Sequence, residues 1–212
     1  MIRLWRVVLA LVIVFALAVG VILAQPQEDA TMRDFFTSPC APPCFMGIRP
    51  GITTTEQALA LLRAHPWVKG VSPAASTFGT GARSYTNIYW GWTGQQPAFI
   101  FDASSASLPY LHIYKGIVQY IRLVTHIPYG AAWLILGMPS SGSLIVDGNN
   151  LGIQTVTYFG GMLAFDSNIA CPMNSAVRWN APISITYSDG TLTAYSRPGF
   201  HLDRASYRSK CQ

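Results

Sequence analysis

The residues of this 212-residue chain whose types suit chemistry are four cysteines, four histidines and a few aspartates. The histidines stand alone, outside the H-E-x-x-H spacing of a zinc protease. They are His65, His112, His126 and His201. Because a metal site needs several ligands at suitable spacing, we expect no metal. We expect His112, on a predicted strand, to have a structural role.

Three aspartates raise the question of acid–base catalysis. Asp102, Asp147 and Asp166 each end a predicted strand. A glycan hydrolase needs two carboxylates that converge on one cleft, whereas aspartates are common in turns. We favour turn positions and keep a glycan or cell-wall hydrolase as an alternative.

The sequence motifs of catalytic and cofactor sites are missing. The chain has no G-x-S-x-G elbow and no glycine-rich phosphate loop between a strand and a helix. Ser188-Asp189-Gly190 is similar to the S-D-N element of penicillin-recognising enzymes, but their S-x-x-K and K-T-G elements are missing. We therefore predict a protein without catalysis and without a cofactor.

The four cysteines predict disulfides, because the chain carries an export signal (below) and their number is even. Of the three possible connectivities we expect Cys40–Cys44 together with Cys171–Cys211. Two prolines between Cys40 and Cys44 pre-set a tight bend. The second bridge would tie the C-terminal tail to the domain.

An aromatic run over residues 85–92 is the candidate binding surface. Strand alternation places Trp90 and Trp92 on one face and Tyr89 on the other, with one face in the core. If exposed, Tyr85, Trp90 and Trp92 would offer a platform for a sugar or a protein partner.

The N-terminal residues of the chain have the pattern of an export signal. Residues 7–27 carry no charge and follow Arg3 and Arg6. About 20 apolar residues span a bilayer, and basic residues stay in the cytoplasm. We predict a membrane anchor over residues 1–27, contacting lipid through residues 7–24, a stalk over 28–39, and an extracytoplasmic remainder. A signal peptide cleaved after Ala24 and a secreted product is the alternative.

Composition argues against a nucleic-acid partner. The net charge of +5 is small, and only 11% of the residues are charged. The basic residues are scattered, with one loose group at the C-terminus, whereas nucleic-acid binding favours a dense basic patch. That group is Arg204, Arg208 and Lys210.

The remaining pattern predicts an α+β fold. Thr53 and Glu56 fit a capping box for a helix that ends at Pro66, and a second short helix is expected over 128–136. Turn residues separate short apolar runs that read as strands. The expected strands are 85–92, 98–102, 110–114, 117–123, 144–146, 153–159, 162–165, 183–187 and 192–195.

The order of these elements repeats. The offsets from Gly51 to Gly130 and from Gly116 to Gly190 are about 79 and about 74 residues. We therefore predict two tandem helix-plus-antiparallel-sheet modules, over residues 40–125 and 126–212. A single continuous α+β domain is the alternative.

CAPPCFMGIRPGITTTEQALALL, residues 40–62, resembles the opening of a family of uncharacterised exported bacterial proteins, with Phe45 in place of an expected Trp. The later LILGMP is similar to the helix end of small outer-membrane assembly lipoproteins of the SmpA/OmlA type. The tandem arrangement is similar to that of β-lactamase inhibitory proteins. The resemblance implies tandem modules and carries no catalytic residues.

We therefore expect a membrane-tethered extracytoplasmic binding or scaffold protein, whose partner is another extracytoplasmic protein or a glycan. A secreted inhibitor of an extracellular enzyme is a further alternative. Fold analogy alone does not choose between them.

Overall fold

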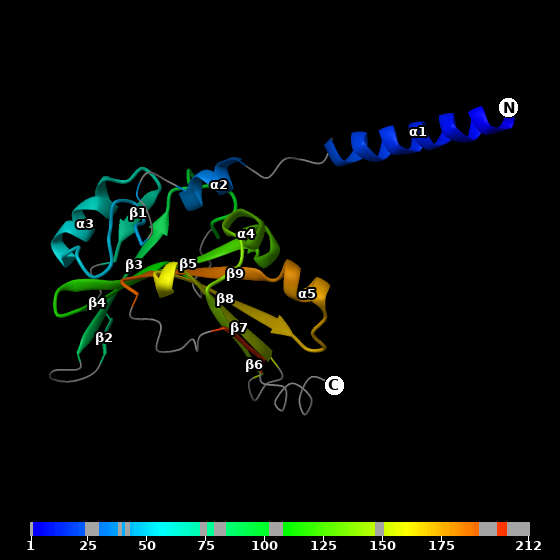
Figure 1. The fold of residues 1–212 in the computed structure, drawn as a ribbon. Helices are drawn as coiled ribbons and strands as arrows, with labels where there is room; N and C mark the ends of the chain where they lie inside the picture. Colours follow the sequence, from blue (N-terminus) through cyan, green and yellow to red (C-terminus); the bar gives the residue numbers. More distant parts are fainter. Residues whose placement is uncertain are drawn as a thin grey trace. The chain divides into compact units, whose positions relative to one another are not determined.

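The computed structural model describes residues 2–23, 30–37, 40, 43–72, 76–78, 84–101, 108–146, 151–190 and 199–202. They form a mixed fold of helices and mainly antiparallel strands, which confirms the predicted α+β class (Figure 1). The chain divides into two compact units, Met1–Phe36 and Thr37–Gln212.

The first unit is helical. It contains α1 (Ile2–Leu23) and the start of α2 (Ala30–Thr37), which lies within the predicted stalk. Large apolar side chains on α1 are exposed, including Leu11 at 64% and Phe15 at 72%. Among the described helices, none is long and apolar enough to cross a membrane.

The second unit is built on one sheet with the strand order β1-β3-β4-β5-β9-β8-β7-β6-β10, and β2 pairs with β3. Adjacent strands are antiparallel except for β10 and β6, which are parallel. The strands are β1 (Val68–Val71), β2 (Ser76–Phe78), β3 (Tyr85–Trp92), β4 (Tyr110–Tyr114), β5 (Ile117–Pro128), β6 (Ser141–Val146), β7 (Leu151–Tyr158), β8 (Leu163–Ala170), β9 (Pro182–Ser188) and β10 (Gly199–Leu202).

Helix α3 (Thr55–Ala64) begins one residue later than the sequence predicts. The capping box uses Thr54 and Gln57 instead of Thr53 and Glu56. The hydroxyl of Thr53 is buried and accepts a hydrogen bond from the Arg49 N–H at 2.8 Å, so it is already engaged in the preceding turn. The next threonine therefore caps the helix.

The hairpin between β4 and β5 follows the prediction. Lys115 and Gly116 have φ values of 51° and 78°, as a two-residue type I′ turn requires. The carbonyl of Gly116 accepts hydrogen bonds from the Thr55 N–H at 2.9 Å and the Thr55 hydroxyl at 3.0 Å. The turn is thereby fastened to the first turn of α3.

Strand β9 departs from the prediction of a hairpin across Asp189-Gly190. It pairs along both edges, with β5 on one side and β8 on the other. The predicted partner, residues 192–195, lies outside the described residues. Both halves of the chain therefore share one sheet, joined where β5 meets β9.

The inner face of the sheet carries the main core. Trp90 is 1% exposed and Trp92 is 6% exposed, and their rings pack edge to face with centroids 5.7 Å apart. They lie on the same face as the buried Leu111, Ile121 and Phe165. The candidate platform required Trp90 and Trp92 to be exposed, and this condition is not met, because their face of β3 is the core face.

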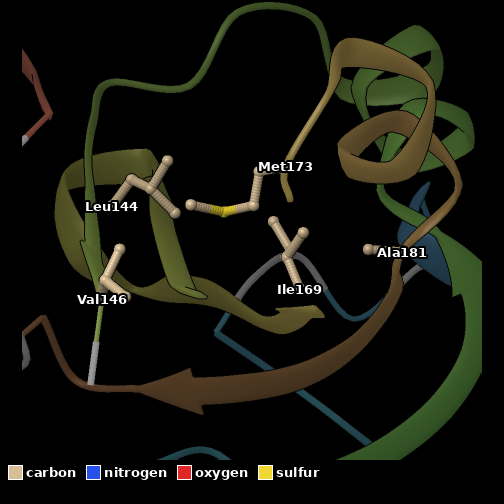
Figure 2. Close-up of a cluster of buried hydrophobic side chains, with 5 residues drawn as sticks. All are labelled: Leu144, Val146, Ile169, Met173 and Ala181. Carbon is tan, nitrogen blue, oxygen red and sulfur yellow. The ribbon is translucent and has the colours of Figure 1, made fainter. Parts of the chain in front are cut away.

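A second buried cluster lies where β6 and β8 meet the segment around α5 (Ser175–Asn180). The Met173 side chain extends toward Leu144 beside Ile169 (Figure 2). A Cβ added to Gly152 would lie 2.4 Å from the Met173 sulfur, so this glycine makes room for it. The cluster comprises Leu144, Val146, Ile169, Met173 and Ala181.

The cysteines agree with the predicted pairing where they are described. Cys40 and Cys44 form a disulfide, with their Cα atoms 5.4 Å apart. Cys171 is disulfide-bonded, and its expected partner Cys211 lies outside the described residues.

Each half contains its predicted helix, and α5 in the second half was not predicted. Helix α3 precedes β3, β4 and β5, and α4 (Tyr129–Leu136) precedes β6 to β9. The short 3-10 turn η2 (Phe159–Gly161) connects β7 to β8. The boundary expected between residues 125 and 126 lies inside β5.

Candidate functional site

The outer face of the sheet carries the aromatic surface, on the side opposite Trp90 and Trp92. Alternation in β3 and β4 brings tyrosines, an asparagine and a histidine to this face, and Tyr120 joins them from β5. All of these side chains are half-buried. We call this set the tyrosine face: Tyr85, Asn87, Tyr89, Tyr110, His112 and Tyr120.

His112 lies at the centre of the tyrosine face. Its ring stacks on Tyr120 at 4.4 Å with an interplanar angle of 9°, and Tyr85 contacts it at 4.6 Å. The Nδ1 atom of His112 lies 2.9 Å from the Asn87 Oδ1 atom. This hydrogen bond places a proton on Nδ1 in the neutral ring. The predicted structural role of His112 agrees with these contacts.

The neighbouring tyrosines are fixed in the same way. Tyr89 and Tyr110 pack at 5.5 Å, and Tyr110 packs edge to face on Tyr120 at 6.0 Å. The Asn87 amide donates a hydrogen bond to the Tyr89 hydroxyl at 3.4 Å. The rings are therefore held by one another before any ligand arrives.

Burial disfavours the charged forms of the groups at the centre of this face. It lowers the pKa of His112 below 6.5 and raises the pKa of Tyr120 above its ordinary value, to which the nearby Tyr110 adds. Both groups are therefore neutral at pH 7.

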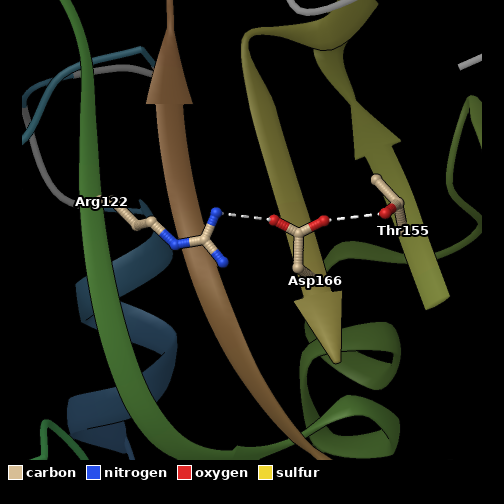
Figure 3. Close-up of polar contacts among 3 residues, drawn as sticks. All are labelled: Arg122, Thr155 and Asp166. Atoms are coloured by element: carbon tan, nitrogen blue, oxygen red, sulfur yellow. Dashed lines mark hydrogen bonds and ion pairs between the residues drawn. The ribbon is translucent and has the colours of Figure 1, made fainter. Parts of the chain in front are cut away.

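A polar network continues the outer face beyond the tyrosines. Asp166 of β8 lies between Arg122 of β5 and Thr155 of β7 (Figure 3). Arg122 Nη1 lies 3.2 Å from one carboxylate oxygen, and the Thr155 hydroxyl donates to the other at 2.8 Å. Tyr110 is the cross-strand neighbour of Arg122, so the network and the tyrosine face are contiguous.

A pocket of about 160 Å³ opens beside this network. Its lining includes Arg122, Val124, Asp166, Asn168, Pro182 and Ser184. These residues come from β5, β8 and β9, which lie side by side in the sheet. The pocket therefore combines a charged pair, an amide and a hydroxyl with two apolar side chains.

No family model matches this chain, and no curated protein or solved structure matches it. The resemblance of residues 40–62 to exported bacterial proteins therefore stays a prediction.

The structure separates the residues predicted as a binding surface. Tyr85 belongs to the tyrosine face, whereas Trp90 and Trp92 belong to the core. Sequence reasoning missed His112, Arg122 and Asp166 as one surface because that surface depends on the register of β3, β4, β5, β9 and β8. The alternating runs Y-T-N-I-Y and Y-L-H-I-Y were the available signal, since each puts polar or aromatic groups on one side.

The carboxylates predicted for a hydrolase are not brought together within the described residues. Asp166 faces Arg122 and Thr155, and Asp102 and Asp147 lie outside the described residues. The described part of the chain also holds no cluster of three metal-ligating side chains. The outer face, as far as it is described, presents aromatic rings beside hydrogen-bonding side chains.

Proposed function

We propose that this protein is a non-catalytic binding module whose tyrosine face contacts an extracytoplasmic partner. The observation that carries the proposal is the set of neighbouring, half-buried tyrosine rings around His112. Tyrosine combines a large apolar ring with a polar tip, and it is enriched where binding energy concentrates. The set is Tyr85, Tyr89, Tyr110 and Tyr120.

Preorganisation supports the proposal. Stacking on His112 and hydrogen bonds through Asn87 restrict the side chains in the unbound protein. A partner then loses less binding free energy to the ordering of these side chains.

We also propose that the protein is attached to a membrane and faces the extracytoplasmic side. The uncharged run after Arg3 and Arg6 supports attachment to a membrane through residues 7–24, with the second unit outside the cytoplasm. Exposed apolar side chains such as Phe15 would be covered by lipid. The Cys40–Cys44 disulfide is also typical of an oxidising compartment.

We further propose that two tandem modules together form the sheet that carries this surface. In each half a helix precedes antiparallel strands, and the strands of both halves join in one sheet. Two modules would therefore present one continuous outer face to the partner.

The test is retention of the full chain on cell-envelope material. The chain, held in a detergent without a sugar headgroup, is applied to immobilised envelope polysaccharide and to immobilised envelope proteins. Tyr89→Ala/Tyr110→Ala should lower the retained fraction at least about tenfold, because two of the four tyrosine rings are lost. The matched control is Ile52→Ala/Met138→Ala, which removes side chains that are 71% and 82% exposed. Equal retention of both double variants would show that the tyrosine face is not the binding surface.

A further inference from the structure

We propose that the pocket beside Arg122 and Asp166 binds one sugar unit of a neutral glycan whose chain extends over the tyrosine face. This inference rests on the proposed function and names the class of its partner.

The size of the pocket favours one small ring from a longer ligand. Its volume of about 160 Å³ is below the ~300–1,000 Å³ of sites that enclose a whole drug-sized molecule. The outer face continues from Asp166 in β8 across β9, β5 and β4 to Tyr89 in β3. Four strand spacings of about 4.8 Å make this path about 19 Å long. A polymer of small rings fits both dimensions.

Charge complementarity selects a neutral ligand. Arg122 and Asp166 form an ion pair within the pocket, so their charges compensate each other. A carboxylate or phosphate on the ligand would be attracted by Arg122 and repelled by Asp166. A cation on the ligand would be repelled by Arg122 and attracted by Asp166. Hydroxyl groups are free of this conflict, because each one both donates and accepts hydrogen bonds.

The polar groups in the pocket match such hydroxyls. Arg122 has five N–H donors, and its bond to Asp166 runs through Nη1. Asn168 is exposed at the pocket and offers both a donor and an acceptor, and Ser184 adds a hydroxyl. A sugar ring in the pocket would find several directed partners within a small volume.

The tyrosine rings can pack against the apolar face of a sugar ring. A pyranose ring carries C–H groups on its faces, which pack on aromatic rings as other apolar groups do. Tyr110 is the cross-strand neighbour of Arg122, and Tyr89 is the cross-strand neighbour of Tyr110. Successive sugar units leaving the pocket would therefore meet Tyr110 first and Tyr89 next.

The experiment is an NMR and calorimetric titration of the full chain in a detergent without a sugar headgroup. The probes are cellohexaose and N-acetylchitohexaose as neutral oligosaccharides, and hexagalacturonate as a charged one. At least one neutral probe should shift the amide signals of Arg122, Asp166 and Asn168. Asn168→Ala and Tyr110→Ala should each weaken that binding about tenfold or more, and Met138→Ala should leave it unchanged. Circular dichroism of each variant checks the fold.

Three outcomes would overturn this inference. They are no binding of either neutral probe at millimolar concentration, tighter binding of hexagalacturonate, and neutral binding that Asn168→Ala leaves unchanged. The retention experiment separates these outcomes from failure of the proposed function. If retention still depends on Tyr89 and Tyr110, the tyrosine face remains the proposed binding surface, and only a neutral glycan is excluded as its ligand.

Discussion

At the scale of single residues, burial raises the pKa of several tyrosine hydroxyls. The side chains of Tyr158 and Tyr187 are almost fully buried, and burial raises the pKa of both hydroxyls above the ordinary value. Burial also raises the pKa of Tyr129 to about 12, where an unfolded tyrosine has a pKa of 10.0. The folded chain therefore holds these protons at pH values where the unfolded chain releases them.

The pH dependence of stability follows for Tyr129. Its folded pKa is raised, so its contribution to the free energy of unfolding is fully present below pH 10 and is lost as the pH rises toward about 12. Between pH 8 and pH 11 the wild type should lose about 1.4 kcal/mol more than Tyr129→Phe. Urea unfolding of both proteins at the two pH values measures this difference. Parallel losses would contradict the assigned effect of burial.

At the scale of elements, α4 and α5 pack closely because a glycine of α4 leaves room for a tryptophan of α5. A Cβ added to Gly130 would lie 2.2 Å from two atoms of the Trp179 ring. Trp133 and Tyr129 of α4 also contact Trp179, with centroids 6.4 Å away in each case. Gly130, in the first turn of α4, therefore determines how closely the two helices approach.

A double-mutant cycle tests this contact. Gly130→Ala alone should destabilise the protein by about 1–3 kcal/mol, because the added methyl group overpacks a filled site. In a Trp179→Ala background the same change should be neutral or stabilising, since alanine is a better helix former than glycine. Denaturant unfolding of the four proteins gives the coupling free energy. A Gly130→Ala effect of equal size in both backgrounds would exclude the contact as its cause.

Part of this fold could be predicted from local signals, but the described part of the strand expected over 98–102 is reduced to an isolated bridge at Ile100, and α2, α5, β1, β2 and β10 were not predicted. Helices near Thr55–Ala64 and Tyr129–Leu136 and the turn at Lys115-Gly116 follow from caps, stop residues and turn chemistry. The exact cap was missed because Thr53, Thr54 and Thr55 are equivalent by type. The Thr53 hydroxyl is engaged by the Arg49 N–H in the preceding turn and the Thr55 hydroxyl by the Gly116 carbonyl, which leaves Thr54 to cap the helix.

The candidate site was harder to predict than the elements that carry it. Period-two alternation shows that Trp90 and Trp92 share a face and that Tyr85 and Tyr89 share the other. It does not show which face is inside, because both faces of β3 carry aromatic rings. That choice depends on what the neighbouring strands place beside them, and Asp166 is 44 residues from Arg122 in sequence.

At the scale of the whole second unit, the sheet makes the two halves interdependent. The register between β5 and β9 runs from Tyr120 opposite Ser188 to Pro128 opposite Pro182. Each half alone would expose this edge, and β5 is a long strand with a largely buried inner side. Unpaired apolar edges of this length favour aggregation. Because both halves contribute strands to one sheet, folding should involve both halves together.

Leu123→Ala is the decisive variant for this cooperativity. Leu123 is 0% exposed in β5 and lies opposite Ile185 of β9. Losing its side chain should cost about 2–5 kcal/mol, since it empties space in a packed core. In native-state hydrogen exchange, amides of Leu111 in β4 and Phe165 in β8 should lose protection by the same free energy, because both report one cooperative opening. Protection lost at Leu111 and retained at Phe165 would show instead that residues 40–125 unfold as an independent module.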